Sequence, residues 1–227
     1  MAHSLMLPDL IIFDFAGTML RDDGAVLAAY RRALTAHDIP FTEADLAARR
    51  GAAKRAVFRD LAGRPIRNTT TDQLAERALA DFESALREEY TSGEVAPIEG
   101  AESTARRLAD RGARIALSSG FDRGLVELLV ERLGWDRLFD RVLAAEDAPS
   151  GRPAPYLIFR AMIDLGVHDL ARVAVVGDTP LDLEAGTNAR AGWVVGVLSG
   201  AHGIETLGAT RHTHLLPSVA QLPALFE

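Results

Sequence analysis

Three aspartates in two short motifs have the residue types and spacing of a divalent-cation site. Asp14 opens the motif Asp-Phe-Ala-Gly-Thr, and Asp178 and Asp182 both lie in Gly-Asp-Thr-Pro-Leu-Asp. Carboxylate oxygens without nitrogen or sulfur ligands suit Mg²⁺ better than zinc. Asp182 is expected in the first turn of a helix, where an acid also complements the helix dipole. We therefore expect Asp14 and Asp178 to bind the ion directly, and we favour an indirect role for Asp182.

A binding site for a small anion is predicted next to these aspartates. Gly17 permits a tight turn, and the backbone N–H groups at Gly17 and Thr18 suit an anion. A phosphoryl group beside a metal-bound carboxylate also needs a cation to balance its charge. Arg152 is the best candidate, because Gly and Pro residues hold it on a stiff loop before a predicted helix.

The elements that must position these residues are short apolar runs, each ending in polar or glycine residues and separated by helical patterns. Such alternation predicts a parallel sheet covered on both faces. The predicted strands are residues 10–13, 115–117, 141–144, 173–176 and 193–198. In an open parallel sheet, ligands bind outside the carboxyl ends of the strands. Asp14, Ser118, Ser119 and Asp178 follow different strands, so we expect them to converge at one edge.

The alternation lapses between Leu20 and Val95, where helix follows helix without a strand signal. An inserted helical domain is the simplest account. We predict a discontinuous core of residues 6–19 and 96–227 and an all-helical insert of residues 20–95. Within the insert, Thr42 and Thr70 are each expected to begin a helix, Thr70 as the first residue of a capping-box pattern.

Composition limits the chemistry. The chain has 227 residues, no Cys, and 25 Lys and Arg against 32 Asp and Glu, a net charge of −7. Without Cys there is no disulfide, thiolate nucleophile or Cys-based metal site. An acidic chain without a long basic block argues against nucleic acid or an anionic membrane as partner. No apolar run reaches the roughly 18 residues of a membrane span, and no secretory pattern precedes the first strand, so we expect a cytoplasmic protein.

Taken in order, four segments resemble the four motifs of the haloacid dehalogenase-like superfamily. They are residues 14–18, the strand ending in Ser118, the Gly-Arg-Pro loop at 151–153 and residues 177–182. The resemblance implies an α/β fold with a Rossmann-like parallel sheet core and a small all-helical cap domain inserted just after the first motif. The helical insert predicted above agrees with that position.

The resemblance also implies roles for individual residues. Asp14 would be the nucleophile that takes the phosphoryl group as an aspartyl phosphate. Mg²⁺ would be held by Asp14, Asp178 and the backbone carbonyl of Ala16. Arg152 would neutralise developing charge. The phosphoryl oxygens would be bound by Ser118 and the groups that follow it, Ser119 and Gly120.

Ala16 is the main departure from the phosphatases of this superfamily, which usually carry a second Asp two residues after the nucleophile as the general acid. The Asp-x-Ala-Gly-Thr form looks like phosphonoacetaldehyde hydrolase and its phosphonatase-like relatives, in which a cap lysine forms an imine with an aldehyde. Lys54 falls where that lysine is expected, and it is the only Lys in the chain. Guanidinium cannot form an imine, so Lys rather than Arg at this position is suggestive. Arg50 and Val57 depart from the Met and His of the phosphonatase pattern.

These observations predict a Mg²⁺-dependent hydrolase of the phosphonatase-like type that uses an aspartyl-phosphate intermediate. Its substrate would be a small phosphonate, such as phosphonoacetaldehyde, or a related phosphorylated metabolite. One alternative is a phosphomonoesterase in which Lys54 only grips the substrate. Another is a non-catalytic binder of metal and phosphate, because no acid stands at Ala16. The sequence is compatible with a homodimer and leaves the oligomeric state open.

Overall fold

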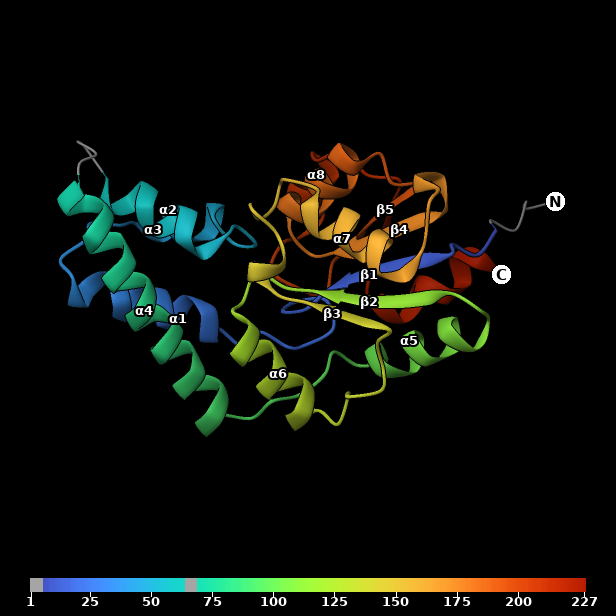
Figure 1. Ribbon diagram of the computed structural model, residues 1–227, viewed down its shortest axis with the longest axis horizontal. Helices are drawn as coiled ribbons and strands as arrows, with labels where there is room; N and C mark the ends of the chain where they lie inside the picture. Colours follow the sequence, from blue (N-terminus) through green and yellow to red (C-terminus); the bar gives the residue numbers. More distant parts are fainter. Residues whose placement is uncertain (1–5, 64–68) are drawn as a thin grey trace. The chain divides into compact units, whose positions relative to one another are not determined.

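The computed structural model describes residues 6–63 and 69–227, and the chain divides into two compact units (Figure 1). The core unit comprises the chain up to Arg21 and again from Val95 to Glu227, and the helical unit comprises Asp22–Glu94. The core thus extends two residues beyond the predicted limit of residue 19. The reason is that Leu20 forms bridges with Ala16 and Pro97, and the Arg21 N–H donates to the Ala96 carbonyl at 3.0 Å.

The core unit contains a six-stranded parallel sheet with the strand order β3-β2-β1-β4-β5-β6. Its strands are β1 (Leu10–Asp14), β2 (Arg114–Ser118), β3 (Arg141–Leu143), β4 (Val173–Gly177), β5 (Trp193–Val197) and β6 (His214–Leu216). Every residue of β1 and β4 is buried, which explains their uninterrupted apolar sequences. The predicted α/β fold with a Rossmann-like parallel sheet is confirmed.

Helices cover both faces of this sheet. Figure 1 shows α7 and α8 on one side and α5 and α6 on the other. The helices of the core unit are α5 (Ala101–Asp110), α6 (Arg123–Arg132), α7 (Tyr156–Leu165), α8 (Pro180–Ala189) and α9 (Ile204–Gly208). Three short 3₁₀ turns complete the unit at Ala145–Asp147, Leu170–Arg172 and Val219–Phe226. Ile12 and Val175 pack against Ile158 of α7 and Ala185 of α8 in one apolar cluster, so these helices are fixed to the strands that carry the aspartates.

The start of α8 is set by local sequence. Thr179 is the N-cap, Pro180 occupies the first turn, and the Thr179 and Asp182 side chains each accept a hydrogen bond from the other's backbone N–H. This capping box satisfies N–H groups that would otherwise lack partners at the helix start. It also fixes Asp182 one turn beyond the end of β4.

The helical unit consists of α1 (Ala25–Ala36), α2 (Glu43–Ala48), α3 (Lys54–Ala62) and α4 (Thr69–Ser92). As expected, Thr42 caps α2, forming a capping box with Asp45. The expectation that Thr70 begins a helix is wrong, because α4 is already helical at Thr69; the residues just before it lie outside the described part of the chain. Local sequence favoured Thr70 as a cap, but the helix extends further toward the N-terminus.

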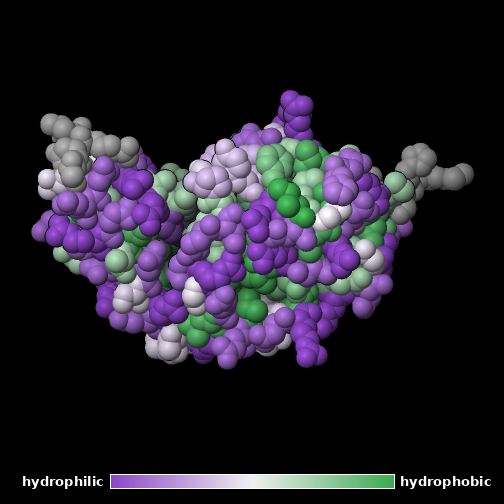
Figure 2. Space-filling model, viewed as in Figure 1, coloured by the Kyte–Doolittle hydropathy of each residue, from purple (hydrophilic) through white to green (hydrophobic). Residues whose placement is uncertain are grey.

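In the described part of the chain, every helix is too short or too polar to cross a lipid bilayer. Figure 2 shows one face of the molecule, which is largely hydrophilic and carries smaller hydrophobic patches over the core unit.

Candidate active site

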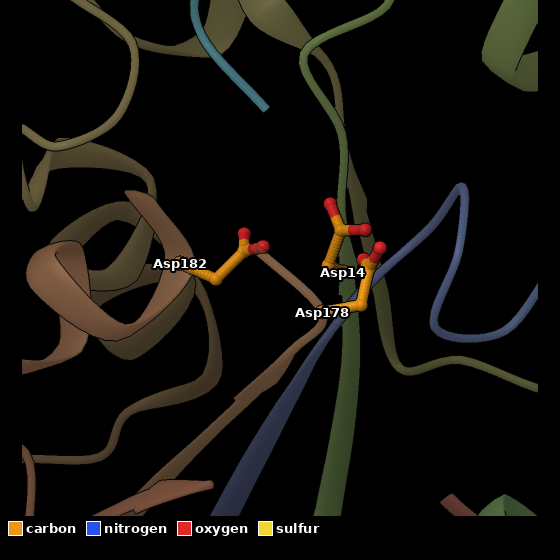
Figure 3. A group of neighbouring side chains, drawn as sticks. All are labelled: Asp14, Asp178 and Asp182. Carbon is orange, nitrogen blue, oxygen red and sulfur yellow. The ribbon is translucent and has the colours of Figure 1, made fainter. Parts of the chain in front are cut away.

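Three aspartates from two strands and a helix form a buried cluster at the carboxyl edge of the sheet. Asp14 ends β1, Asp178 directly follows the neighbouring strand β4, and Asp182 points toward both from the first turn of α8 (Figure 3). One carboxylate oxygen of each lies within 4.8 Å of the others. Asp14, Asp178 and Asp182 are only 7%, 0% and 2% exposed.

Asp178 is held by groups from distant parts of the chain. Its Oδ1 accepts a hydrogen bond from the Thr18 hydroxyl at 3.1 Å, and its Oδ2 accepts one from the Ala201 N–H at 2.7 Å. Gly17 and Gly200 pack against the same carboxylate so closely that an added Cβ would lie 2.2 and 2.3 Å from its Oδ2. Only glycine fits at these two positions, and Gly17 also has a φ of +99°.

Asp182 uses both of its carboxylate oxygens within the protein. Oδ2 accepts from the Thr179 N–H at 3.0 Å and from the Thr179 hydroxyl at 2.6 Å. Oδ1 forms an ion pair with Arg152. Asp182 is therefore engaged in capping α8 and in holding Arg152, which supports an indirect role toward a metal ion.

Arg152 lies among the carboxylates, with its side chain 9% exposed. Its Nη1 is 2.6 Å from Asp14 Oδ1 and also contacts Asp182, and its Nη2 donates to the Ser118 carbonyl at 3.1 Å. The guanidinium thus connects the ends of β1 and β2 to the start of α8. A planar group with several fixed N–H donors is suited to such a position.

Burial dominates the electrostatics of the cluster. It raises the pKa of Asp14 to about 6, although the Arg152 charge acts in the opposite direction. Burial also raises the pKa of Asp178 well above its ordinary value, and the charges of Asp14 and Asp182 raise it further. For Arg152, burial alone would lower the pKa, but Asp182 and Asp14 outweigh it and the pKa is raised. Three carboxylates around one guanidinium leave excess negative charge, which a divalent cation would balance.

The donor set fits Mg²⁺. Carboxylate and carbonyl oxygens are the ligands this ion prefers, and the three carboxylates lie close enough together, within 4.8 Å, to surround one ion. Asp14 and Asp178 are the residues that would hold the ion. In the described part of the chain no backbone N–H donates to the Ala16 carbonyl, so that oxygen suits a third protein ligand.

A family model of haloacid dehalogenase-like hydrolases matches residues 8–190, which contain Asp14, Arg152, Asp178 and Asp182. The chain belongs to this family. The predicted resemblance is confirmed by this match and by curated relatives named phosphonoacetaldehyde hydrolase.

Among these relatives, the protein from Parabacteroides distasonis is 34% identical over 109 residues, covering 47% of this chain and 40% of the relative. The protein from Bacillus cereus is 26% identical over 208 residues, covering 85% of this chain and 76% of the relative. The first of these matches spans less than half the length of the curated relative. The crystal structure of a hydrolase from Pseudomonas syringae has a TM-score of 0.84 at 21% identity, covering 95% of this chain and 96% of that chain, so the fold is shared.

In this haloacid dehalogenase-like hydrolase, the two N–H groups that follow Asp14 and were expected to bind an anion instead form hydrogen bonds within the turn. The Gly17 N–H donates to the Leu20 carbonyl at 2.7 Å, and the Thr18 N–H donates to the Phe15 carbonyl at 3.3 Å. The structure instead places Thr18 as a donor to Asp178. The sequence predicted a tight turn at Gly17. The hydrogen bonds that close the turn could not be predicted, because they depend on the path of the chain from Gly17 to Leu20.

The groups after β2 differ in what they can offer a phosphoryl oxygen. Ser118 pairs with Asp14 in the strand register, beside the Arg152 side chain. The Ser119 N–H donates to the Leu143 carbonyl at 2.9 Å, and the Ser119 hydroxyl accepts from the Phe121 N–H at 3.1 Å. The N–H is therefore used at the sheet edge, whereas the hydroxyl keeps its own proton to donate. Ser118, Ser119 and Gly120 stay our predicted phosphoryl-binding residues on this loop.

Lys54 lies in the helical unit as the first residue of α3, half-buried, and its Nζ donates to the Ala52 carbonyl at 3.3 Å. Arg50 is ion-paired with Asp22 at 3.2 Å. Val57 is buried and contributes to the apolar side of α3. The part that Lys54 plays in chemistry at Asp14 stays a prediction.

Gly200 and Ala201 were not identified as site residues from the sequence. They follow β5 on the edge of the sheet where the aspartates lie, and both contact Asp178. Neither residue has a reactive side chain. Ala201 contacts Asp178 through its backbone N–H, and Gly200 can lie against the Asp178 carboxylate because it has no Cβ. A glycine just beyond a predicted strand end was one signal in the sequence, because glycine allows another chain segment to approach closely.

Proposed function

We propose that this protein is a Mg²⁺-dependent, phosphonatase-like hydrolase that cleaves the carbon–phosphorus bond of a small phosphonate carrying an aldehyde. The observation that carries the proposal is Ala16, two residues beyond Asp14 in a buried cluster otherwise equipped for phosphoryl transfer. A methyl group cannot protonate a leaving alkoxide. A reaction whose leaving group takes its electrons into an imine needs no acid at that position.

In this proposal Asp14 attacks phosphorus and carries the phosphoryl group. Arg152, at 2.6 Å from its Oδ1, favours the ionised carboxylate that attack requires, against the effect of burial. Asp182 and the Ser118 carbonyl hold Arg152 in place, so that its charge also faces the transferring group. A bound Mg²⁺ would supply Lewis-acid charge to the phosphoryl oxygens.

Lys54 supplies the electron sink. Its neutral amine adds to the aldehyde carbon and loses water, giving a protonated imine. The carbon–phosphorus bond then breaks, the phosphoryl group passes to Asp14, and the bonding electrons move toward the imine nitrogen to give an enamine. Protonation of the enamine carbon and hydrolysis of the imine release the aldehyde, and water hydrolyses the aspartyl phosphate. For phosphonoacetaldehyde the sum is substrate plus water giving acetaldehyde and phosphate.

A second candidate is a phosphomonoesterase for substrates with good leaving groups. The buried Val57 favours it, because that residue lies one turn after Lys54 and cannot move protons during imine formation. In this case Lys54 contributes only its charge, and Lys54→Arg should retain activity.

The test is phosphate release from phosphonoacetaldehyde and from p-nitrophenyl phosphate, each with MgCl₂ or with EDTA, followed by borohydride trapping. The proposal expects Mg²⁺-dependent cleavage of the phosphonate and reduction of the imine to a secondary amine on Lys54, located by mass spectrometry. Lys54→Arg should lose both, and Asp14→Asn should lose turnover while keeping the borohydride adduct. Undiminished phosphonate cleavage by Lys54→Arg would overturn the imine role. Cleavage of the ester alone would select the phosphomonoesterase.

A further inference from the structure

Lys54 occupies a position that does not suit a cation on local grounds. It is the first residue of α3, and the preceding Ala53 offers no side-chain cap. The first turn of a helix carries partial positive charge from its unpaired N–H groups, so an ammonium group is disfavoured there. Other contacts must therefore help to hold the Lys54 side chain where it is.

One such contact is an aromatic ring. The Lys54 Nζ lies 5.7 Å from the centroid of the Tyr30 ring, within the distance at which a cation is attracted to the face of an aromatic group. This attraction grows as the pair is withdrawn from water, and the Tyr30 ring is buried. It therefore favours the ammonium group where the helix start disfavours it.

The Tyr30 ring is rigidly fixed. It is 0% exposed and packs against Phe58 and Phe82, with ring centroids 5.4 and 4.5 Å away. Phe58 and Phe82 are also 5.5 Å from each other, so the three rings form a cluster joining α1, α3 and α4. A ring held from two sides cannot turn away from the lysine without disturbing the packing of the helical unit.

The hydroxyl of Tyr30 is not what holds the ring in place. Within the described part of the chain this buried hydroxyl has no hydrogen-bond partner, an arrangement that destabilises the folded state. Burial raises its pKa above the ordinary value, so the ring stays neutral. What Tyr30 offers Lys54 is therefore the face of a neutral ring, and phenylalanine could offer the same face.

The backbone leading to Lys54 is fixed as well. Arg49 donates to the Asp45 carbonyl at 2.9 Å and to the Asp60 carboxylate at 2.7 Å, and Arg50 is paired with Asp22. These bonds tie residues 49 and 50 to α2, to α3 and to the start of the helical unit. The lysine is thus fixed at its backbone by ion pairs and near its amine by the ring.

We propose that Tyr30 is a positioning residue for Lys54, its ring face setting where the reactive amine lies. The inference rests on the imine role of Lys54 in the proposed function. An aromatic face attracts the ammonium and the protonated imine alike, so it can hold the side chain in both charged states of the reaction. The ring face itself adds no proton acceptor beside the nitrogen.

The first test measures the contact between the Lys54 amine and the Tyr30 ring by NMR, without an activity assay. Because Lys54 is the sole lysine, reductive methylation with ¹³C-formaldehyde gives one dimethyl-lysine signal, apart from that of the terminal amine. In the wild type and in Tyr30→Phe its methyl protons should be shifted upfield by the ring. In Tyr30→Leu they should move to the position of a solvated dimethyl-lysine. A wild-type signal already at that position, or one unchanged in Tyr30→Leu, would overturn the inference.

The second test measures how loss of the ring affects the reaction of Lys54. Tyr30→Leu should lower kcat for phosphonate cleavage and the rate of borohydride labelling by about 10- to 100-fold, since a small misplacement of a reacting group has effects of that size. Tyr30→Phe should restore both. Thr42→Ala is the control, because it removes the cap of α2 in the same helical unit and leaves the three rings in place; it should lower the melting temperature and keep kcat. Equal kcat values for Tyr30→Leu and Thr42→Ala would refute positioning. If no phosphonate is cleaved by any form, the proposed function fails while the ring contact is still decided by the methyl signal.

Discussion

Replacing Asp14 with asparagine is expected to raise the stability of the metal-free protein while abolishing turnover. The cause is the cost of keeping a buried carboxylate ionised beside two others. Burial raises the pKa of Asp14 from 3.8 to about 6, with Arg152 acting against the shift and Asp182 adding to it. The folded state therefore binds this proton more tightly than the unfolded state. Protonated Asp14 therefore contributes to the free energy of unfolding at low pH, and this contribution is lost as pH rises from 3.8 through about 6.

The magnitude follows from the two pKa values. Ionising Asp14 costs the folded state about 3 kcal/mol at pH 7.5, and this cost falls progressively as pH is lowered toward 4. Asparagine has a similar shape and no charge, so Asp14→Asn avoids this cost. For a chain of this size, about 3 kcal/mol corresponds to a rise of roughly 6–12 °C in melting temperature at pH 7.5.

The assay is thermal unfolding in EDTA across this pH range, followed by titration with MgCl₂. Asp14→Asn should exceed the wild type most at pH 7.5 and progressively less toward pH 4, and MgCl₂ should raise the melting temperature of the wild type far more than that of the variant. Asp9→Asn is the control, because a hydrogen bond from Arg172 lowers the pKa of that exposed carboxyl and its removal should give no gain. An Asp14→Asn protein no more stable than the wild type at pH 7.5, or a difference that does not shrink on acidification, would refute the reasoning.

Three further predictions, which use five substitutions, test other parts of the structure. Gly200→Ala would place a methyl group 2.3 Å from the Asp178 carboxylate, so kcat and Mg²⁺ affinity should fall about tenfold or more in kinetics and calorimetry. Gly203→Ala, with nothing within 4 Å of the added carbon, should match the wild type. Asp182→Asn should lower kcat more than Mg²⁺ affinity, whereas Asp178→Asn should lose both; equal losses of metal affinity would place Asp182 on the ion. Thr42→Ala removes the cap of α2 and should lower the free energy of unfolding by about 1 kcal/mol without changing kcat at 25 °C.

Much of the core could be read from the sequence because its strands are buried on both faces. Buried parallel strands have uninterrupted apolar sequences, and the polar residues that end them mark one edge of the sheet. Asp14 and Ser118 were expected to converge on this basis, and the strand register places them side by side. The start of α8 was equally local, since Thr179, Pro180 and Asp182 define it within four residues.

Contacts made by backbone atoms were harder to predict. Gly200 and Ala201 support Asp178 without any reactive side chain, and the N–H groups of Gly17 and Thr18 turn inward to close a loop. Such bonds depend on the path of the chain between the strands. Residue type carries little information about that path.

The sequence by itself determined the reactive groups, the parallel sheet and the family motifs, because each depends on residue type and short-range spacing. Only the tertiary structure decided how those groups are used. The Thr18 hydroxyl donates to Asp178, which is 160 positions further along the chain. Arg152 pairs with one carboxylate oxygen of Asp182, and the other oxygen caps α8. The Lys54 amine lies over the Tyr30 ring. These pairings come from burial and packing between distant segments, which no local pattern encodes.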